Sequence, residues 1–180
     1  VMWLQSGIES FSDKVLKLMH KGVSALQNVQ LLKWAQEYGV SLSYNILVGF
    51  AGEEDEDYDD IIRIMNRITH LPPPSGKATV VQVHRFSPFF CRPGDHGIVN
   101  IKADSYYKHL IPPSIINADE IAYFFNRELP TNAAVFRNIN RLNDTIVKWK
   151  QSTRRMTAKL GADFIEVCTI DKTGKEVNIL

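Results

Sequence analysis

Three short turns carry the residue types in this sequence that are best suited to binding a small ligand. Each turn directly follows an apolar run: they are Gly7 to Ser10, Gly49 to Glu53 and Arg85 to Pro88. In barrels and open sheets of parallel strands, ligands bind at the carboxyl ends of the strands, where loops converge and helix N-termini offer free N–H groups. The sequence therefore predicts a ligand-binding site formed by these three turns.

Two other groups of residues have the types that bind a metal ion or act as a nucleophile. The acidic run from Glu53 to Asp60 lacks the spacing and the sixth-position glycine of an EF-hand, and acidic residues are common at helix starts. Cys91 with His84 or His96 offers at most half of a structural zinc site, which takes four ligands. We expect no catalytic residue and no metal site here, and a free, half-buried thiol at Cys91.

A long basic helix is the remaining candidate for a binding surface. The predicted helix runs from Asn132 to about Leu160 and has Asp144 as its lone acidic residue. Such a face could bind an acidic peptide or the phosphate backbone of a nucleic acid, although a solvated helix face is the commoner explanation. Nucleic acid is therefore an unlikely partner. The basic residues of this helix are Arg137, Arg141, Lys148, Lys150, Arg154, Arg155 and Lys159.

The elements that would position the three turns alternate between strand and helix. Ser24 and Gln27 form a capping-box pattern at the start of one helix, and proline at 72–74 ends another. This alternation predicts right-handed parallel βαβ crossovers, and hence an α/β sheet or barrel segment. Hydrophobic periodicity predicts strands at 1–4, 40–50 and 78–86, and helices between Ser12 and Gly22, over 25–38 and over 55–70.

The C-terminal half breaks this rhythm. Residues 98–118 are irregular, 119–128 are predicted as a short helix, and the long basic helix follows. Strands at 164–170 and 175–179 flank Asp171 to Gly174, which is a strong hairpin signal. We therefore divide the chain into residues 1–97 and an accessory region of residues 98–180.

Composition limits the class of protein. The chain has 180 residues, a formal net charge of +1, 44% hydrophobic residues and two cysteines, which is typical of an ordinary globular protein in a reducing cytoplasm. No apolar run approaches the roughly 18 to 20 residues needed to span a bilayer. Because the chain opens directly in an apolar, strand-like run, we expect it to be cut from something longer.

Three segments in register resemble a known superfamily. They read LQSGIESFSDKVLKLMHKG, YGVSLSYNILVGFAGE and VVQVHRFSPFFCRPG. Together they resemble the second half of the radical S-adenosylmethionine (SAM) barrel, over residues 1 to about 97. More narrowly they resemble its cobalamin-binding group, which includes peptide-maturation C-methyltransferases and the anaerobic magnesium-protoporphyrin monomethyl ester cyclase. The resemblance implies an α/β fold with strands four to six of a partial TIM barrel. The residue pattern of 98–180 adds a mostly helical extension that ends in a β-hairpin.

The resemblance also implies a set of cofactor-binding residues. Glu9 and Ser10 would contact the ribose and the methionine moiety of SAM. The segment with Asn45, Leu47, Gly49 and Glu53 would line the adenine site. At the third turn, main-chain groups of Phe86 and Ser87 would meet the adenine edge. The family pattern usually has Gly at position 45, Ile at 47 and Pro at 51, and this chain has Asn45, Leu47 and Ala51 instead.

The CxxxCxxC motif that holds the [4Fe–4S] cluster of the family is absent from this sequence. We therefore expect a C-terminal part of a larger enzyme, inactive alone, with no cofactor bound to this chain. The complete protein would use SAM, a [4Fe–4S] cluster and cobalamin for radical C-methylation or oxidative cyclisation of a peptide or a tetrapyrrole.

The expected partner is the missing N-terminal half of the protein, and no membrane is expected. Because half a barrel leaves edge strands open, we expect this chain either to self-associate or to close its sheet with its own C-terminal hairpin. The alternative function is a non-catalytic α/β module that binds a partner protein.

Overall fold

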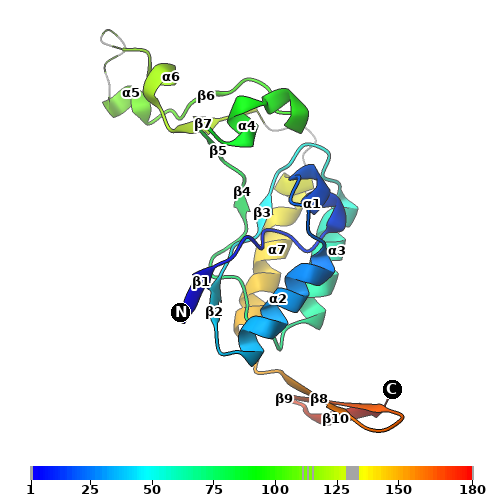
Figure 1. The fold of residues 1–180 in the computed structure, drawn as a ribbon. Helices are drawn as coiled ribbons and strands as arrows, with labels where there is room; N and C mark the ends of the chain where they lie inside the picture. The colour runs from blue at the N-terminus through cyan, green and yellow to red at the C-terminus, as the bar shows by residue number, and fades with distance from the viewer. Residues whose placement is uncertain (1, 111, 113, 115, 129–133, 180) are drawn as a thin grey trace.

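A computed structural model describes residues 2–110, 112, 114, 116–128 and 134–179. Val1 and Asn132, at which two of the predicted elements begin, lie outside the described residues. Figure 1 shows three parts, which we name the α/β unit (residues 2–80 with the helix α7, Ala134–Lys150), the second lobe (the described residues of 83–128) and the terminal meander (155–179). The second lobe and the terminal meander lie at opposite ends of the α/β unit.

The strands of the α/β unit are short and pair in parallel. β1 (Trp3–Gln5) pairs with β2 (Ser41–Ser43), and β3 (Leu47–Val48) pairs with β4 (Thr79–Val80). Parallel pairs require a crossover, and here helices supply it. The described residues form small separate sheets and no closed barrel, so the half-barrel architecture stays a prediction.

Three helices connect these strands, close to where the hydrophobic periodicity predicts them. They are α1 (Asp13–Leu18), α2 (Ala25–Glu37) and α3 (Asp55–Arg67). The capping box at the start of α2 is confirmed, because the Ser24 hydroxyl accepts from the Gln27 N–H and the Gln27 side chain accepts from the Ser24 N–H. α3 ends three residues earlier than predicted.

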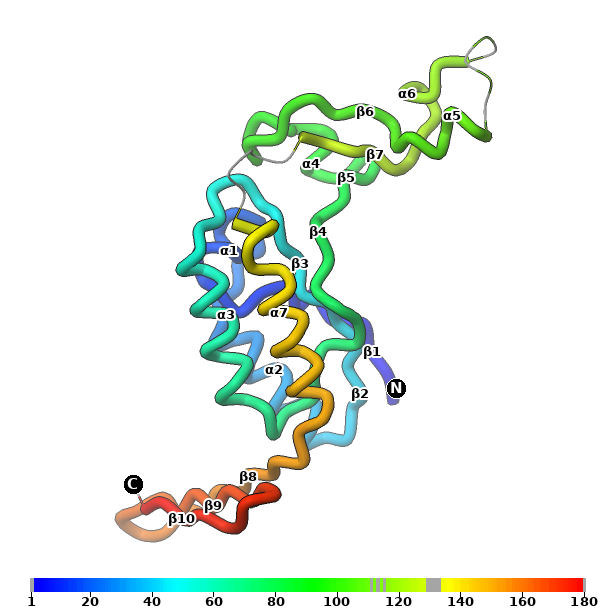
Figure 2. The backbone as a smooth tube through the Cα atoms, turned by 180° about the vertical axis from the view of Figure 1, so that it is seen from behind, coloured from blue at the N-terminus to red at the C-terminus, as the bar shows by residue number. Residues whose placement is uncertain are grey.

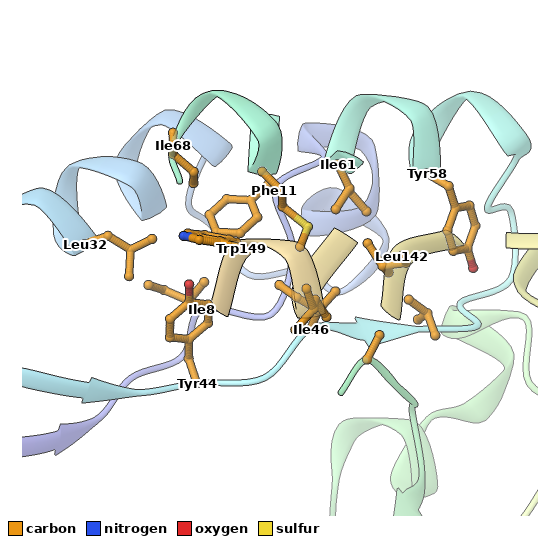
Figure 3. Packing of buried hydrophobic residues seen from close by; sticks show 14 of the residues in the cluster. Ile8, Phe11, Leu32, Tyr44, Ile46, Tyr58, Ile61, Ile68, Leu142 and Trp149 are labelled. Atoms are coloured by element: carbon orange, nitrogen blue, oxygen red, sulfur yellow. The ribbon is translucent and has the colours of Figure 1, made fainter. Parts of the chain in front are cut away.

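The helix α7 (Ala134–Lys150) completes the core of the α/β unit and runs beside α3 (Figure 2). Trp149 is buried, and its ring lies 6.2 Å from the ring of Phe11 (Figure 3). Its indole Nε1 donates to the carbonyl oxygen of Leu71 over 2.9 Å. The predicted helix to about Leu160 was wrong: α7 ends at Lys150, and residues 155–160 form a strand.

The second lobe is built on an antiparallel sheet of β5 (Val83–His84), β7 (Phe124–Asn126) and β6 (Lys102–Ala103). The strand predicted over 78–86 is therefore split between two sheets. The helix predicted over 119–128 is confirmed only at its start, because the helix there ends at Ile121 and β7 follows. The helical turns of this lobe are α4 (Pro88–Cys91), the 3₁₀ helix η1 (Pro93–His96), α5 (Tyr107–Leu110) and α6 (Ala118–Ile121).

The terminal meander contains the predicted hairpin and one strand more. β9 (Ile165–Asp171) and β10 (Gly174–Ile179) pair across the Asp171–Gly174 turn, and β8 (Arg155–Leu160) pairs with the other edge of β9. In the described part of the chain this sheet is separate from β1 and β2, so the hairpin does not close the edge of the parallel strands. None of the described helices is long and apolar enough to cross a membrane.

Candidate functional site

A sharp turn at Gly49 ends β3 and forms the centre of the candidate site. Gly49 and Gly52 have φ angles of 87° and 92°, a region that side chains with a Cβ atom rarely adopt. The turn lies beside the end of β4, because the Val81 N–H donates to the Val48 carbonyl oxygen over 2.8 Å. Two strand ends therefore meet at this point.

Glu53 holds the turn closed from one side. Its Oε2 accepts from the Gly49 N–H over 2.8 Å and from the Tyr58 hydroxyl over 2.5 Å. Burial raises the pKa of Glu53, although these hydrogen bonds favour its charged form. The other oxygen, Oε1, is buried and has no hydrogen-bond partner. Glu53 thus braces the loop with one oxygen and leaves one buried acceptor unused.

Arg127 holds the same glycine from the other side. It follows β7 in the second lobe, and its Nη2 donates to the Gly49 carbonyl oxygen. Burial lowers the pKa of this guanidinium, and its Nε is buried without a hydrogen-bond partner. Sequence reasoning missed Arg127, because the contact spans 78 positions and no local pattern signals it.

A pocket of about 290 Å³ opens next to this pair of strand ends. One wall comes from the end of β4 and the other from β7, so the pocket lies between the α/β unit and the second lobe. A larger groove of about 800 Å³, between α2, the end of α3 and β8, contains none of the predicted site residues. The residues that line the smaller pocket are Val80, Val81, Gln82, Phe125, Asn126 and Arg127.

The first predicted turn lies next to the second. The Leu47 N–H donates to the Glu9 carbonyl oxygen over 2.9 Å, and the Glu9 carboxylate pairs with Lys21 at 2.8 Å. Ser10 is fully buried; its hydroxyl accepts from the Ser12 N–H and its carbonyl oxygen from the Asn28 side chain. Ser10 therefore shapes the turn, and the predicted SAM contacts of Glu9 and Ser10 stay predictions.

Asn45 and Leu47, the two predicted site residues in the strand predicted over 40–50, differ in environment. Asn45 is exposed, and its Oδ1 accepts from the Gly76 N–H over 3.1 Å. The half-buried Leu47 side chain packs against a buried cluster that contains Phe50 and Val81. Leu47 is thus close to the pocket, whereas the Asn45 amide is engaged with a neighbouring loop.

The third predicted turn belongs to the second lobe. Phe86 is 78% exposed with a φ angle of 68°, and the Ser87 hydroxyl caps α4 by accepting from the Phe90 N–H. The lobe touches the second turn through the rings of Phe50 and Phe89, whose centroids are 5.9 Å apart. The structure therefore brings Glu9, Leu47, Gly49 and Glu53 together and places Phe86 and Ser87 in the second lobe, between β5 and α4.

The acidic run and the basic helix form ion pairs with each other. Asp55 of α3 pairs with Arg137 of α7 at 3.0 Å, and Asp59 pairs with Arg141 at 2.7 Å. Two of the seven basic residues therefore contribute to packing between α3 and α7. This is a structural role that the sequence pattern did not predict.

The cysteines do not fit an iron–sulfur cluster. Cys91 is exposed on α4, Cys168 is buried in β9, and a radical SAM cluster needs three thiolates. Within the described residues, no group of three or more His, Cys, Asp and Glu side chains is arranged to hold a metal ion. A cluster would therefore need ligands from outside this chain.

Comparisons with curated proteins support one class for this chain, the radical SAM superfamily. Partial matches include tRNA-2-methylthio-N(6)-dimethylallyladenosine synthases from three bacteria. The Hahella chejuensis protein is 34% identical over 70 residues (38% of this chain, 16% of the relative), and the Syntrophobacter fumaroxidans protein is 36% identical over 62 residues (33% and 14%). The Sulfurimonas denitrificans protein is 43% identical over 70 residues (37% and 15%).

These matches span about a seventh of the length of these relatives. They do not support the narrower resemblance to cobalamin-dependent methyltransferases or the cyclase. No family model matches the chain. No solved structure matches it either.

Proposed function

We propose that this chain forms part of the adenosyl-binding crevice of a radical SAM enzyme. The observation that carries the proposal is the Gly49 turn, where the ends of β3 and β4 meet next to the segment after β1. Carboxyl ends of neighbouring parallel strands are where α/β folds bind cofactors. The partial similarity to radical SAM methylthiotransferases supports the same class.

The residues around the pocket fit an adenosyl group in their chemistry. Val80, Val81 and Phe125 offer apolar surface to an aromatic base, and Gln82 offers both a hydrogen-bond donor and an acceptor. The unused Glu53 Oε1 is an acceptor next to the same turn. SAM bound at a cluster and reduced by one electron would supply the radical that abstracts hydrogen from the substrate. The residues of this chain would bind and orient the adenosyl group and exclude water.

The narrower reaction is also a proposal. Radical C-methylation or oxidative cyclisation, with cobalamin and a peptide or tetrapyrrole substrate, rests on the resemblance of the three segments. Transfer of a methylthio group to tRNA is a second candidate, because the matched relatives carry that activity in their names. Arg137 and Arg141 of α7 form ion pairs with acidic residues of α3. Because these two side chains are already paired, we do not expect α7 to bind the phosphates of tRNA.

We also propose that a further part of the same protein covers β1. Among the described strands β1 pairs with β2 alone, and Trp3 and Leu4 are 58% and 48% exposed. An exposed apolar edge strand is a site for pairing with another segment. The isolated chain would then self-associate through this edge, and light scattering that shows a monomer would contradict this expectation.

A cytoplasmic location of the complete protein is part of the proposed function.

The test is SAM cleavage by the protein expressed from the complete reading frame, purified and reconstituted with iron and sulfide without oxygen. We expect 5′-deoxyadenosine on reduction, and none from the 180-residue chain alone. Val80→Trp places a large ring in the pocket and should abolish SAM cleavage. Val177→Trp is the control, because Val177 is about as exposed as Val80 but lies in the terminal meander, and this variant should still cleave SAM. Mass spectrometry of the modified substrate would distinguish methylation, cyclisation and methylthiolation.

Two outcomes would overturn the proposal. The first is a complete protein that has no CxxxCxxC motif or forms no 5′-deoxyadenosine, which would favour a non-catalytic interaction module. The second is a Val80→Trp variant that cleaves SAM as fast as the unchanged protein, which would place the adenosyl group elsewhere.

A further inference from the structure

The groove of about 800 Å³ between α2, the end of α3 and β8 has an apolar wall and a strand wall. Val29, Ile68 and Leu71 line it, and all three belong to the core of the α/β unit or pack against it. Leu26 also lines it, with a side chain that is 76% exposed. Residues 156–158 of β8 form the strand wall.

The strand wall has an open edge. Among the described strands β8 pairs with β9 alone. At the turn between them the Gly161 N–H donates to the Phe164 carbonyl oxygen over 2.8 Å, so these two residues form a hydrogen-bonded pair. Because hydrogen-bonded and non-hydrogen-bonded pairs alternate along antiparallel strands, Met156 and Ala158 direct their N–H and C=O groups away from β9. Both residues line the groove.

This combination fits an extended polypeptide. A row of open N–H and C=O groups is complementary to another extended backbone. An added strand would present every second side chain to the apolar wall of the groove. A volume of about 800 Å³ holds roughly 25 non-hydrogen atoms at about 30 Å³ for each water-sized unit, or about three to four residues.

The charges around the groove favour an acidic peptide. Lys33 and Glu37 line the groove and pair with each other at 2.6 Å, so their charges cancel. Arg154 and Arg155 add positive charge at the start of β8, where Arg155 lies opposite an isoleucine of β9. Burial, and then the charge of Arg154, lower the pKa of His70, which lines the groove. The positive charge of Arg154 therefore lies close to the groove wall.

A second copy of this chain fits the edge less well. Residues 154–160 include Arg155 and Lys159 and no acidic residue. Antiparallel pairing of two such strands about Thr157 would set Arg155 of one copy opposite Lys159 of the other. Like charges directly opposite each other destabilise a strand pair.

We propose that the open edge of β8 binds an extended acidic peptide as an additional strand, with alternate apolar side chains in the groove beside α2. Main-chain hydrogen bonds to Met156 and Ala158 supply affinity, and the groove selects apolar residues at every second position. The basic start of β8 selects acidic residues between them. The site itself is independent of the proposed function, whereas its use for a peptide substrate rests on that function.

The test is fluorescence anisotropy of labelled acetyl-Glu-Val-Glu-Val-Glu-Val-amide with the protein expressed from the complete reading frame. Two matched peptides carry N-methyl groups, one on the valine nitrogens and the other on the glutamate nitrogens. We expect at least one of them to bind about tenfold or more weakly, because an added strand donates from alternate residues. A peptide with lysine in place of glutamate should bind about threefold or more weakly. Hydrogen exchange of residues 155–160 should slow on binding.

Ala158→Pro removes an N–H group that faces the open edge and leaves the bonds between β8 and β9 in place. We expect it to weaken peptide binding by about fivefold or more. Val177→Pro is the matched control. Val177 lies opposite Cys168, whose N–H and C=O groups face β8, so the Val177 N–H faces the open edge of β10. This variant should bind the peptide as tightly as the unchanged protein, and circular dichroism would show whether each variant is folded.

If Ala158→Pro does not fold, the N-methylated peptides on the unchanged protein still decide the question. Equal binding of the plain and both N-methylated peptides, equal binding of the acidic and lysine peptides, or slowed exchange outside β8 would overturn the inference.

Two results would assign the edge to another occupant and overturn the inference as well. Peptide binding by the 180-residue chain but not by the complete protein would indicate that another part of the same protein fills the groove. A dimer that Ala158→Pro dissociates would indicate a second copy. Peptide binding combined with no SAM cleavage by the complete protein would keep the site and refute the proposed function.

Discussion

Trp149→Phe tests whether α7 is a structural part of the α/β unit. Trp149 is 2% exposed, and its Nε1 donates to the carbonyl oxygen of Leu71, itself a buried residue. Phenylalanine keeps an aromatic ring but cannot donate, and a buried carbonyl group without its partner costs about 1–3 kcal/mol. The smaller ring also leaves a cavity that costs about 1 kcal/mol. We therefore expect the free energy of unfolding to fall by about 2–4 kcal/mol, a large part of the stability of a typical domain.

Urea unfolding followed by circular dichroism measures this loss. Trp34→Phe is the matched control, because Trp34 is 47% exposed on α2 and its replacement should change the free energy of unfolding by about 0.5 kcal/mol or less. The unchanged protein should lose the signal of α2, α3 and α7 in one transition. Equal, small effects of the two substitutions would refute the packing of α7 into the common core.

Two further predictions concern buried polar groups. Burial raises the pKa of Glu53 above its ordinary value of 4.5, so the folded state binds the proton more tightly than the unfolded state. The protonated Glu53 therefore contributes fully to the free energy of unfolding below the ordinary pKa. This contribution is lost as the pH rises through the raised pKa. Glu53→Gln should therefore flatten the decline in unfolding free energy across that window, and an unchanged pH profile in urea titrations would contradict this. Asn138→Ala should cost about 1–3 kcal/mol, since the buried Asn138 side chain donates to Asp55 and to the Ala134 carbonyl oxygen. The exposed Asn140→Ala is its control in thermal unfolding, and an equal shift in melting temperature for both would show that these bonds do not stabilise the fold.

The parts of the fold with local signals were predictable from the sequence. The Ser24 capping box and the apolar stripe of Tyr58, Ile61 and Met65 depend on residues a few positions apart, and the structure confirms α2 and α3. Asp171 to Gly174 predicts a hairpin for the same reason, because the turn residues themselves determine its geometry.

The errors arose where distant pairing decides the structure. Phe124 to Asn126 form β7 because β5 and β6 lie on either side, and no local pattern reveals those neighbours. Beyond Lys150, Met156, Ala158 and Leu160 alternate with polar residues, which is a strand period that a helical interpretation of the basic run obscured.

The candidate site was predictable in part. The glycine-bearing turn after β3 and its neighbour at Glu9 follow from the rule that strand ends hold ligands, and the structure shows them side by side. The pairing of the Gly49 carbonyl oxygen with Arg127 depends on how the second lobe folds back, and the pairing of Asp55 with Arg137 depends on α7. Neither partner can be found without the tertiary structure.

The late position of α7 in the chain has a consequence for biosynthesis. The apolar face formed by Phe11, Leu32 and Ile61 is complete once about residue 78 has been synthesised, but its cover includes Trp149. At about 5–20 residues per second, the ribosome needs roughly 4–14 s to add the seventy or so residues in between. During those seconds the nascent chain exposes this apolar face to chaperones and to other nascent chains. The yield of folded protein therefore depends on how well the cell shields that surface until translation passes α7.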